Sequence, residues 1–143
     1  MSNIVMDLAQ VSRCGAYYRS RKLEELNLTI RQARLLLEVC ATPDISQDAL
    51  SRRLCMEKSA VTRSLAGLED LGYVERVNCQ KDKRVTRVHP TAKAQELKPK
   101  LDALWDSCQQ QLTEGMTEEE LAVLAQMLDR MKAQAMKLME VDK

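Results

Sequence analysis

The stretch between Ser46 and Thr91 constrains the fold of this chain more than any other segment. It contains two short amphipathic segments, residues 46–54 and 58–71, the second of which is expected to stop at Gly72, followed by two strand-like runs, residues 73–77 and 85–89. Leucine and valine recur at three- and four-residue spacing in the first two segments, so each is expected to form a helix with one apolar face. Two short helices of this kind must bury those faces against each other. The sequence therefore predicts a helix-turn-helix followed by a β-hairpin.

The predicted second helix and the hairpin loop both carry side chains suited to contact with nucleic acid. The N-terminal part of such a helix points at base edges when the helix lies in a major groove. The residues there are Lys58, Ser59, Ala60, Thr62 and Arg63. The loop residues are Lys81, Asp82, Lys83 and Arg84. A basic loop on a stiff ribbon can reach phosphates or the minor groove. We therefore predict that these residues contact double-stranded DNA.

Basic charge is concentrated in the same stretch. Residues 46–93 carry ten lysines and arginines against six acidic residues, a net charge of +4, whereas the rest of the chain carries twelve against fifteen. The whole chain is nearly neutral, with a formal charge of +1. A local basic face can still bind phosphates by releasing counterions. For single residues such as Arg52 or Arg76, an ordinary solvated surface remains an equal alternative.

Four more helices are predicted, and they begin near Asn3, Thr29, Thr91 and Thr117. Thr29 with Gln32 and Thr117 with Glu120 have the spacing of capping boxes. The 143 residues include no phenylalanine and few other aromatic residues, so leucine, valine, methionine and alanine must form the core. We expect a mainly α fold with a small β-hairpin wing. In it, residues 29–91 form a winged helix-turn-helix, and residues 1–28 and 92–143 form a helical dimerisation region.

The two ends of the chain hold more apolar positions than one small winged helix can cover. Unbranched, adaptable side chains add to this surface on the last helix, at Met127, Met131, Met136 and Met139. Burial against a second copy would cover it, and a two-fold dimer would place two recognition helices about one DNA turn, roughly 34 Å, apart. The alternative is that the methionines fill the core of the monomer.

Several short motifs, in their order and spacing, resemble those of the MarR family of bacterial transcriptional regulators over nearly the whole chain. They are residues 28–32, 46–50, 57–63, 68–76, 82–84 and 90–91. The resemblance implies a homodimer, expected to be a repressor, that binds a pseudo-palindromic operator. It also implies that Arg84 enters the minor groove and that Asp82 holds the wing arginines. Two residues depart from the family pattern, because Pro90 replaces a leucine and Ala94 replaces a glycine.

The resemblance further implies an effector that binds between the terminal helices and the DNA-reading region and changes the spacing of the recognition helices. Four side chains on the first helix could present charge and hydroxyl groups to a small anionic or aromatic molecule. They are Arg13, Tyr17, Tyr18 and Arg21. A solvated helix face explains the same four residues equally well.

Cys14 is the candidate for a thiol-based redox switch, which is an alternative to a small-molecule effector. Cationic neighbours such as Arg13 and Arg19 could lower the pKa of its thiol and make it reactive. The five cysteines are odd in number and contain no CxxC pair, which argues against structural disulfides. The only histidine is His89, so a Cys/His zinc site is not expected.

Other functional classes find little support in the sequence. Four scattered glycines form no phosphate-binding loop, and one histidine offers no catalytic constellation, so we expect no enzyme and no cofactor. No apolar run approaches the roughly 20 residues that span a bilayer, and the N-terminus lacks a signal peptide pattern, so a cytoplasmic protein without membrane contact is expected. A winged helix that binds only another protein remains an alternative.

Overall fold

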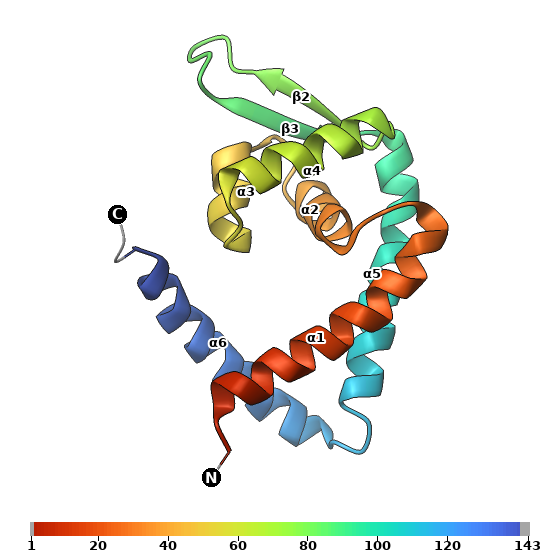
Figure 1. The fold of residues 1–143 in the computed structure, drawn as a ribbon, viewed down its shortest axis with the longest axis vertical. Coiled ribbons are helices and arrows are strands. Elements are labelled where there is room, and N and C mark those ends of the chain that lie inside the picture. Colours follow the sequence, from red (N-terminus) through yellow and green to blue (C-terminus); the bar gives the residue numbers. More distant parts are fainter. Residues whose placement is uncertain (1, 141–143) are drawn as a thin grey trace. The chain divides into compact units, whose positions relative to one another are not determined.

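The computed structural model describes residues 2–140, and the chain divides into two compact units, Met1–Cys108 and Gln109–Lys143. Figure 1 shows the elements of the chain and labels all of them except η1 and β1. They are α1 (Ile4–Leu23), the 3-10 helix η1 (Glu24–Leu26), α2 (Ile30–Ala41), β1 (Ile45–Ser46), α3 (Gln47–Leu54), α4 (Lys58–Asp70), β2 (Val74–Asn78), β3 (Thr86–Pro90), α5 (Ala92–Leu112) and α6 (Glu118–Glu140). The unit boundary falls within α5. The mainly helical winged helix-turn-helix fold is confirmed, with β1 as a third strand.

Local capping explains where the helices begin. The Asn3 side chain accepts a hydrogen bond from the Met6 backbone N–H at 3.1 Å. Thr29 and Gln32 form a reciprocal capping box, with hydrogen bonds of 3.1 and 3.0 Å. Thr117 and Glu120 form another at the start of α6. Each cap satisfies N–H groups that the first helical turn leaves without partners.

The core of the first unit lies where α2, α3 and α4 meet. Leu50 of α3 and Leu65 and Leu68 of α4 are fully buried, together with Leu35 and Leu36 of α2. This packing confirms that the apolar faces of the two short helices are buried. The turn that joins them reverses at Cys55, whose φ of 52° lies in the left-handed region.

Gly72 ends α4, as predicted, through a Schellman motif. Its φ is 83°, and its N–H donates to the Glu69 carbonyl at 3.0 Å. The Tyr73 N–H donates back to the Leu68 carbonyl at 2.9 Å. A left-handed residue at this position favours glycine, which has no Cβ to clash with the neighbouring backbone.

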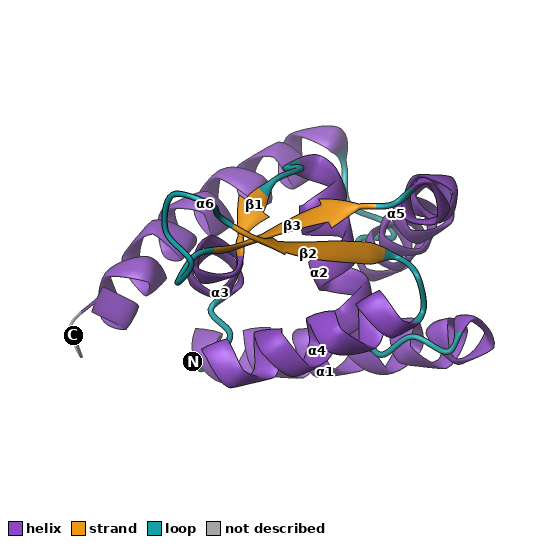
Figure 2. Ribbon diagram, turned by 90° about the horizontal axis from the view of Figure 1, so that it is seen from above, coloured by secondary structure: helices purple, strands orange, loops and turns teal. Residues whose placement is uncertain are grey.

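The three strands form an antiparallel sheet in the order β1-β3-β2, which Figure 2 shows from above. Both hairpin strands begin one residue later than predicted. For β2 the reason is the helix cap, because the Tyr73 N–H is already bonded within the α4 terminus and the ladder starts at Val74, opposite Pro90. Val74 and Val88 are buried, whereas Val77 pairs with Arg87 and is exposed.

The junction between the wing and α5 is held by Thr91. Its hydroxyl donates to the Gly72 carbonyl at 2.7 Å and accepts from the Ala94 N–H at 3.3 Å, so it caps α5 as predicted. Ala94 is completely buried, so the alanine that replaces the family's glycine packs in the core. Across residues 2–140, no helix combines the length and the apolar character that crossing a membrane requires.

Candidate nucleic-acid interface

The N-terminal half of α4 has one buried and one exposed side. Val61 and Leu65 face the core, while Lys58, Thr62 and Arg63 are exposed, together with Ser59. Ala60 is different, because only 8% of it is accessible. It packs beside Val61 on the inner side of the helix and does not fit the DNA-facing set to which the sequence assigned it.

The first turn of α3 contacts the exposed side of α4. The Asp48 carboxylate lies 3.6 Å from the Lys58 ammonium, and the Gln47 amide donates to the Thr62 hydroxyl at 3.3 Å. The Thr62 hydroxyl in turn donates to the Lys58 carbonyl at 2.9 Å. The sequence analysis did not single out Gln47 or Asp48, because their position beside α4 depends on how the two helices cross.

The wing loop presents Arg84 to solvent in a fixed geometry. The side chain is 91% exposed, and its Nε and Nη2 atoms donate to the two carboxylate oxygens of Asp82 at 3.1 and 3.3 Å. The Arg84 backbone N–H also donates to Asp82. The hydrogen bonds from the Arg84 side chain, followed by the one from its backbone, lower the pKa of Asp82. Lys81 and Lys83 are exposed beside this pair.

An ion pair at its base ties the wing to the recognition helix. Arg76 of β2 donates to Glu69 of α4 through its backbone N–H and its Nη2 atom, both at 3.1 Å. The side-chain hydrogen bond from Arg76 is the main cause that lowers the pKa of Glu69. The hairpin runs back alongside α4, so that its tip and the N-terminal end of α4 lie toward the same side of the unit (Figures 1 and 2). Arg76 therefore braces the wing and is not merely a solvated charge.

A cavity of about 460 Å³ lies within the first unit, apart from this exposed side. Its lining comes from α1, α2, the end of α3, the turn that follows α3, and α5. The residues are Ser12, Ala16, Arg19, Ile30, Arg31, Arg34, Arg53, Leu54, Met56 and Trp105. Glu38 binds Arg34 at 3.1 Å and Arg53 at 3.2 Å. Arg19 stacks on Trp105, 4.9 Å from the ring centroid, and its buried Nε has no hydrogen-bond partner among the described residues.

The four side chains expected to bind an effector do not line this cavity. Tyr17 is exposed and its hydroxyl accepts a hydrogen bond from Arg21 at 3.1 Å, while Arg13 is exposed on the same helix. Tyr18 is half-buried, and its hydroxyl lies 3.2 Å from that of Ser107 on α5. The four predicted residues are therefore separate from the cavity that the arginines line.

Cys14 is exposed on α1 and its thiol is free. Two of the arginines near it in sequence have aromatic partners, because Arg19 stacks on Trp105 and Arg21 on Tyr17. Among the described residues, no group of three or more histidines, cysteines and carboxylates is placed to hold a metal ion.

A helix with an exposed cationic N-terminal end, set beside a braced basic wing, defines a winged helix-turn-helix DNA-binding transcriptional regulator. Comparison with known proteins agrees. The MarR family model matches residues 26–85. The HTH-type transcriptional regulator YybA of Bacillus subtilis (strain 168), described as uncharacterized, is 21% identical over 132 residues, which cover 92% of this chain and 88% of YybA.

Solved structures extend the likeness to the complete fold. A MarR protein from Peptoclostridium difficile DA00132 has a TM-score of 0.95 and 26% identity, covering 99% of this chain and 93% of that one. A MarR family regulator from Listeria monocytogenes, solved in complex with a 26mer DNA, has a TM-score of 0.91 and 24% identity, covering 96% and 91%. The chain is thus similar to the MarR family, in sequence over residues 26–85 and in fold over nearly its whole length. This family of transcriptional regulators is not enzymatic, which confirms that expectation.

Proposed function

We propose that the chain is a homodimeric repressor that binds a pseudo-palindromic operator and is released by a small-molecule effector. Three exposed cations support DNA recognition. Lys58 and Arg63 lie in the N-terminal half of α4 and Arg84 lies in the wing loop, and these two parts lie toward the same side of the unit. In this proposal α4 occupies the major groove with Lys58, Ser59, Thr62 and Arg63. The wing residues Lys81, Lys83 and Arg84 reach the adjacent minor groove, and Asp82 orients Arg84.

The test of DNA binding is fluorescence anisotropy with the purified protein and duplex DNA from upstream of its own gene, at several salt concentrations. Phosphate contacts release counterions, so we expect affinity to fall steeply as salt rises. The affinity for an unrelated duplex of equal length measures non-specific binding. A protein that ignores duplex DNA at low salt would support the protein-binding alternative instead.

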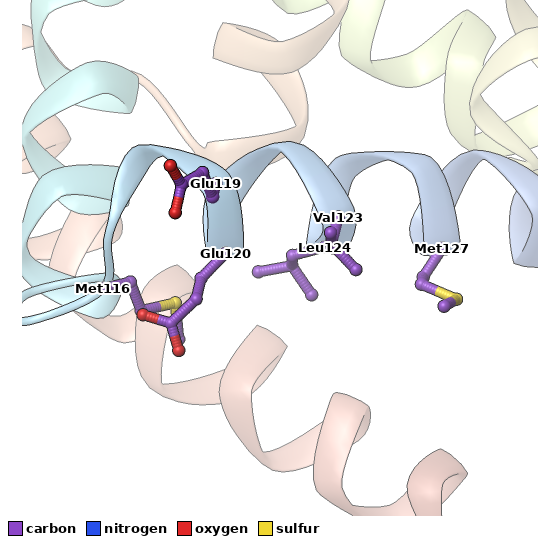
Figure 3. A pocket seen from close by; sticks show the side chains of 6 residues that line it. All are labelled: Met116, Glu119, Glu120, Val123, Leu124 and Met127. Atoms are coloured by element: carbon purple, nitrogen blue, oxygen red, sulfur yellow. The ribbon is translucent and has the colours of Figure 1, made fainter.

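The proposed dimer rests on the exposed apolar surface of the two terminal regions, which agrees with assigning residues 1–28 and 92–143 to dimerisation. Helix α6 has no buried residue, and Figure 3 shows Leu124 and Met127 projecting from one side of it. Val123 is 52% and Met127 51% exposed. On α1, Ile4, Val5 and Met6 are each more than three-fifths exposed. Exposed apolar side chains gathered on one helix face mark protein interfaces.

A charge placed on that surface should separate the dimer. We expect Leu124→Glu to shift the mass measured by light scattering from two chains toward one. Ala122→Glu is the matched control, because it adds the same charge about 200° around the helix. If both variants keep the mass of two chains, this side of α6 is not the interface.

The proposed effector site is the cavity that contains Arg19 and Trp105. Four arginines and no carboxylate are among the described residues that line it, and the carboxylate of Glu38 binds two of these arginines, Arg34 and Arg53. Arg31 and the stacked Arg19 therefore leave uncompensated positive charge beside the apolar surface of Ile30, Leu54 and Met56. A flat anion with an aromatic or apolar body fits this chemistry, since pockets of 300 to 1,000 Å³ are typical for small ligands.

Trp105 is the only tryptophan in the chain, so its fluorescence reports on the cavity directly. Titration with benzoate and 1-naphthoate should change this fluorescence and release DNA, whereas neutral benzamide should not. Arg31→Ala should weaken binding of the acids. The matched control is Arg13→Ala, which removes the same charge from the α1 face first expected to bind the effector. A loss of binding in Arg13→Ala alone would favour that face.

A redox switch at Cys14 remains the second candidate, supported by the exposure of its thiol. It is tested by DNA binding before and after mild peroxide treatment and then dithiothreitol. Release on oxidation that is reversed by the reductant and absent from Cys14→Ser would support it.

A further inference from the structure

The first turn of α3 lies against the side of α4 that the proposed function assigns to DNA. Gln47 and Asp48 begin α3 directly after Ser46, whose hydroxyl caps the helix by accepting from the Ala49 N–H at 3.1 Å. This cap fixes the turn, and Gln47 and Asp48 extend from it toward Thr62 and Lys58 respectively. α3 is therefore more than a support for the recognition helix.

The hydrogen bonds around Thr62 leave part of the Gln47 amide available. The Thr62 hydroxyl donates to the Lys58 carbonyl and accepts from the Gln47 Nε2, so its orientation is set. The carboxamide of Gln47 has two N–H donors and an oxygen acceptor, and this contact uses one donor. The second donor and the oxygen have no partner among the described residues, so both can form hydrogen bonds with a bound molecule.

We propose that Gln47 is a specificity-determining residue that, together with Thr62, reads one base pair in each half-site. The inference rests on the proposed function, because it requires α4 to lie in the major groove. A carboxamide accepts from the N6 amino group of adenine through its oxygen and donates its N–H to N7, through two parallel hydrogen bonds, and no other base offers that pair of groups there. Thr62 restricts the amide to one position, so the wild-type protein prefers adenine at the base that Gln47 reaches.

Asp48 has a different role in the same turn. Its carboxylate lies 3.6 Å from Lys58, and the side chains are 68% and 76% exposed. The pair therefore contributes little to stability, but the carboxylate competes with DNA phosphates for Lys58. Phosphate contacts carry no sequence information. Asp48 thus lowers affinity for every duplex alike, which makes it an internal comparison for Gln47.

The experiment is selection of bound sequences from a randomised duplex library, followed by affinity measurements on single-site variants. Gln47→Ala should lose the preference at one position per half-site by about tenfold, within the range for a bidentate base contact. Gln47→Glu, which can only accept, should shift that position toward cytosine. Gln95→Ala, which truncates an exposed glutamine on α5, should select the wild-type sequence.

The Asp48→Asn variant tests whether a changed preference in Gln47→Ala comes from the lost base contact or from a movement of the first turn of α3. It should strengthen binding to all sequences by a similar factor and leave the preference unchanged. The proposal is overturned if Gln47→Ala selects the wild-type sequence at every position, or if Asp48→Asn alters the same position as Gln47→Ala. Failure of the wild-type protein to select any sequence would instead overturn the proposed function.

Discussion

Removing Arg84 should reduce DNA affinity mainly at low salt and leave the fold intact. One protomer exposes five cations in the proposed interface, at Lys58, Arg63, Lys81, Lys83 and Arg84, so a dimer exposes ten. If all contact phosphates, the logarithm of the affinity falls with the logarithm of salt concentration with a slope of about −9. Arg84→Ala removes two contacts per dimer and should bring the slope to about −7. The ratio between wild-type and variant affinities should therefore shrink about tenfold between 50 and 200 mM salt.

The assay is anisotropy on one operator duplex across that salt range, with thermal unfolding measured in parallel. Arg84 is almost fully exposed and its side chain pairs with Asp82 in the same loop, so the melting temperature should not change. Lys22→Ala, which removes a charge from the last turn of α1, should keep the wild-type slope. Parallel lines for the wild type and Arg84→Ala would refute the reasoning, because they would mean that Arg84 releases no counterions.

Two further predictions concern stability. Burial raises the pKa of Glu38, but hydrogen bonds from Arg34 and Arg53 outweigh it and hold the pKa below 4.5; the ionised group therefore stabilises the fold above pH 4.5 and loses this contribution as the pH falls below it. Glu38→Gln should cost about 1 kcal/mol at pH 7, allowing for half-exposed arginines. It should also flatten the dependence of the melting temperature on pH between roughly pH 5 and pH 3, the range around the ordinary glutamate pKa. An unchanged pH dependence would count against a stabilising role for the Glu38 ion pairs. Gly72→Ala places a Cβ at a φ of 83° and should cost about 1 kcal/mol in urea unfolding, and a neutral result would contradict the Schellman cap.

Features that depend on neighbouring residues could be predicted from the sequence, and those that depend on helix crossing could not. The capping boxes at Thr29 and Thr117 and the stop at Gly72 lie within a few residues and were predicted correctly. Ala60, which the sequence placed in the DNA-facing set, is only 8% accessible; it lies about 100° from Val61 around the helix, at a border that the helical wheel alone does not assign to either side. The cavity escaped prediction because Arg19 and Trp105 lie far apart in sequence and meet only when α1 packs against α5. The contact of Gln47 with Thr62 was missed for a similar reason.

The cavity and the DNA-reading helix share a structural element, which is the turn between α3 and α4. Leu54 at the end of α3 and Met56 in the turn line the cavity, and Glu57 is the N-cap residue of α4, which begins at Lys58. Ser51 holds the turn closed, because its carbonyl accepts from the Met56 N–H at 3.0 Å and its buried hydroxyl donates to the Met56 carbonyl. A ligand that displaces Leu54 or Met56 must therefore move the start of the recognition helix.

Loosening this turn should weaken the coupling between the two sites. Ser51→Ala leaves the Met56 carbonyl without that donor, at a cost of about 1 to 2 kcal/mol, and lets the turn shift without moving α4 to the same extent. An aromatic acid that quenches Trp105 should then bind about as before but release DNA less effectively. Because coupling is reciprocal, operator DNA should also oppose the acid less in the variant. Wild-type coupling in Ser51→Ala, measured in both directions, would show that the signal reaches α4 by another route.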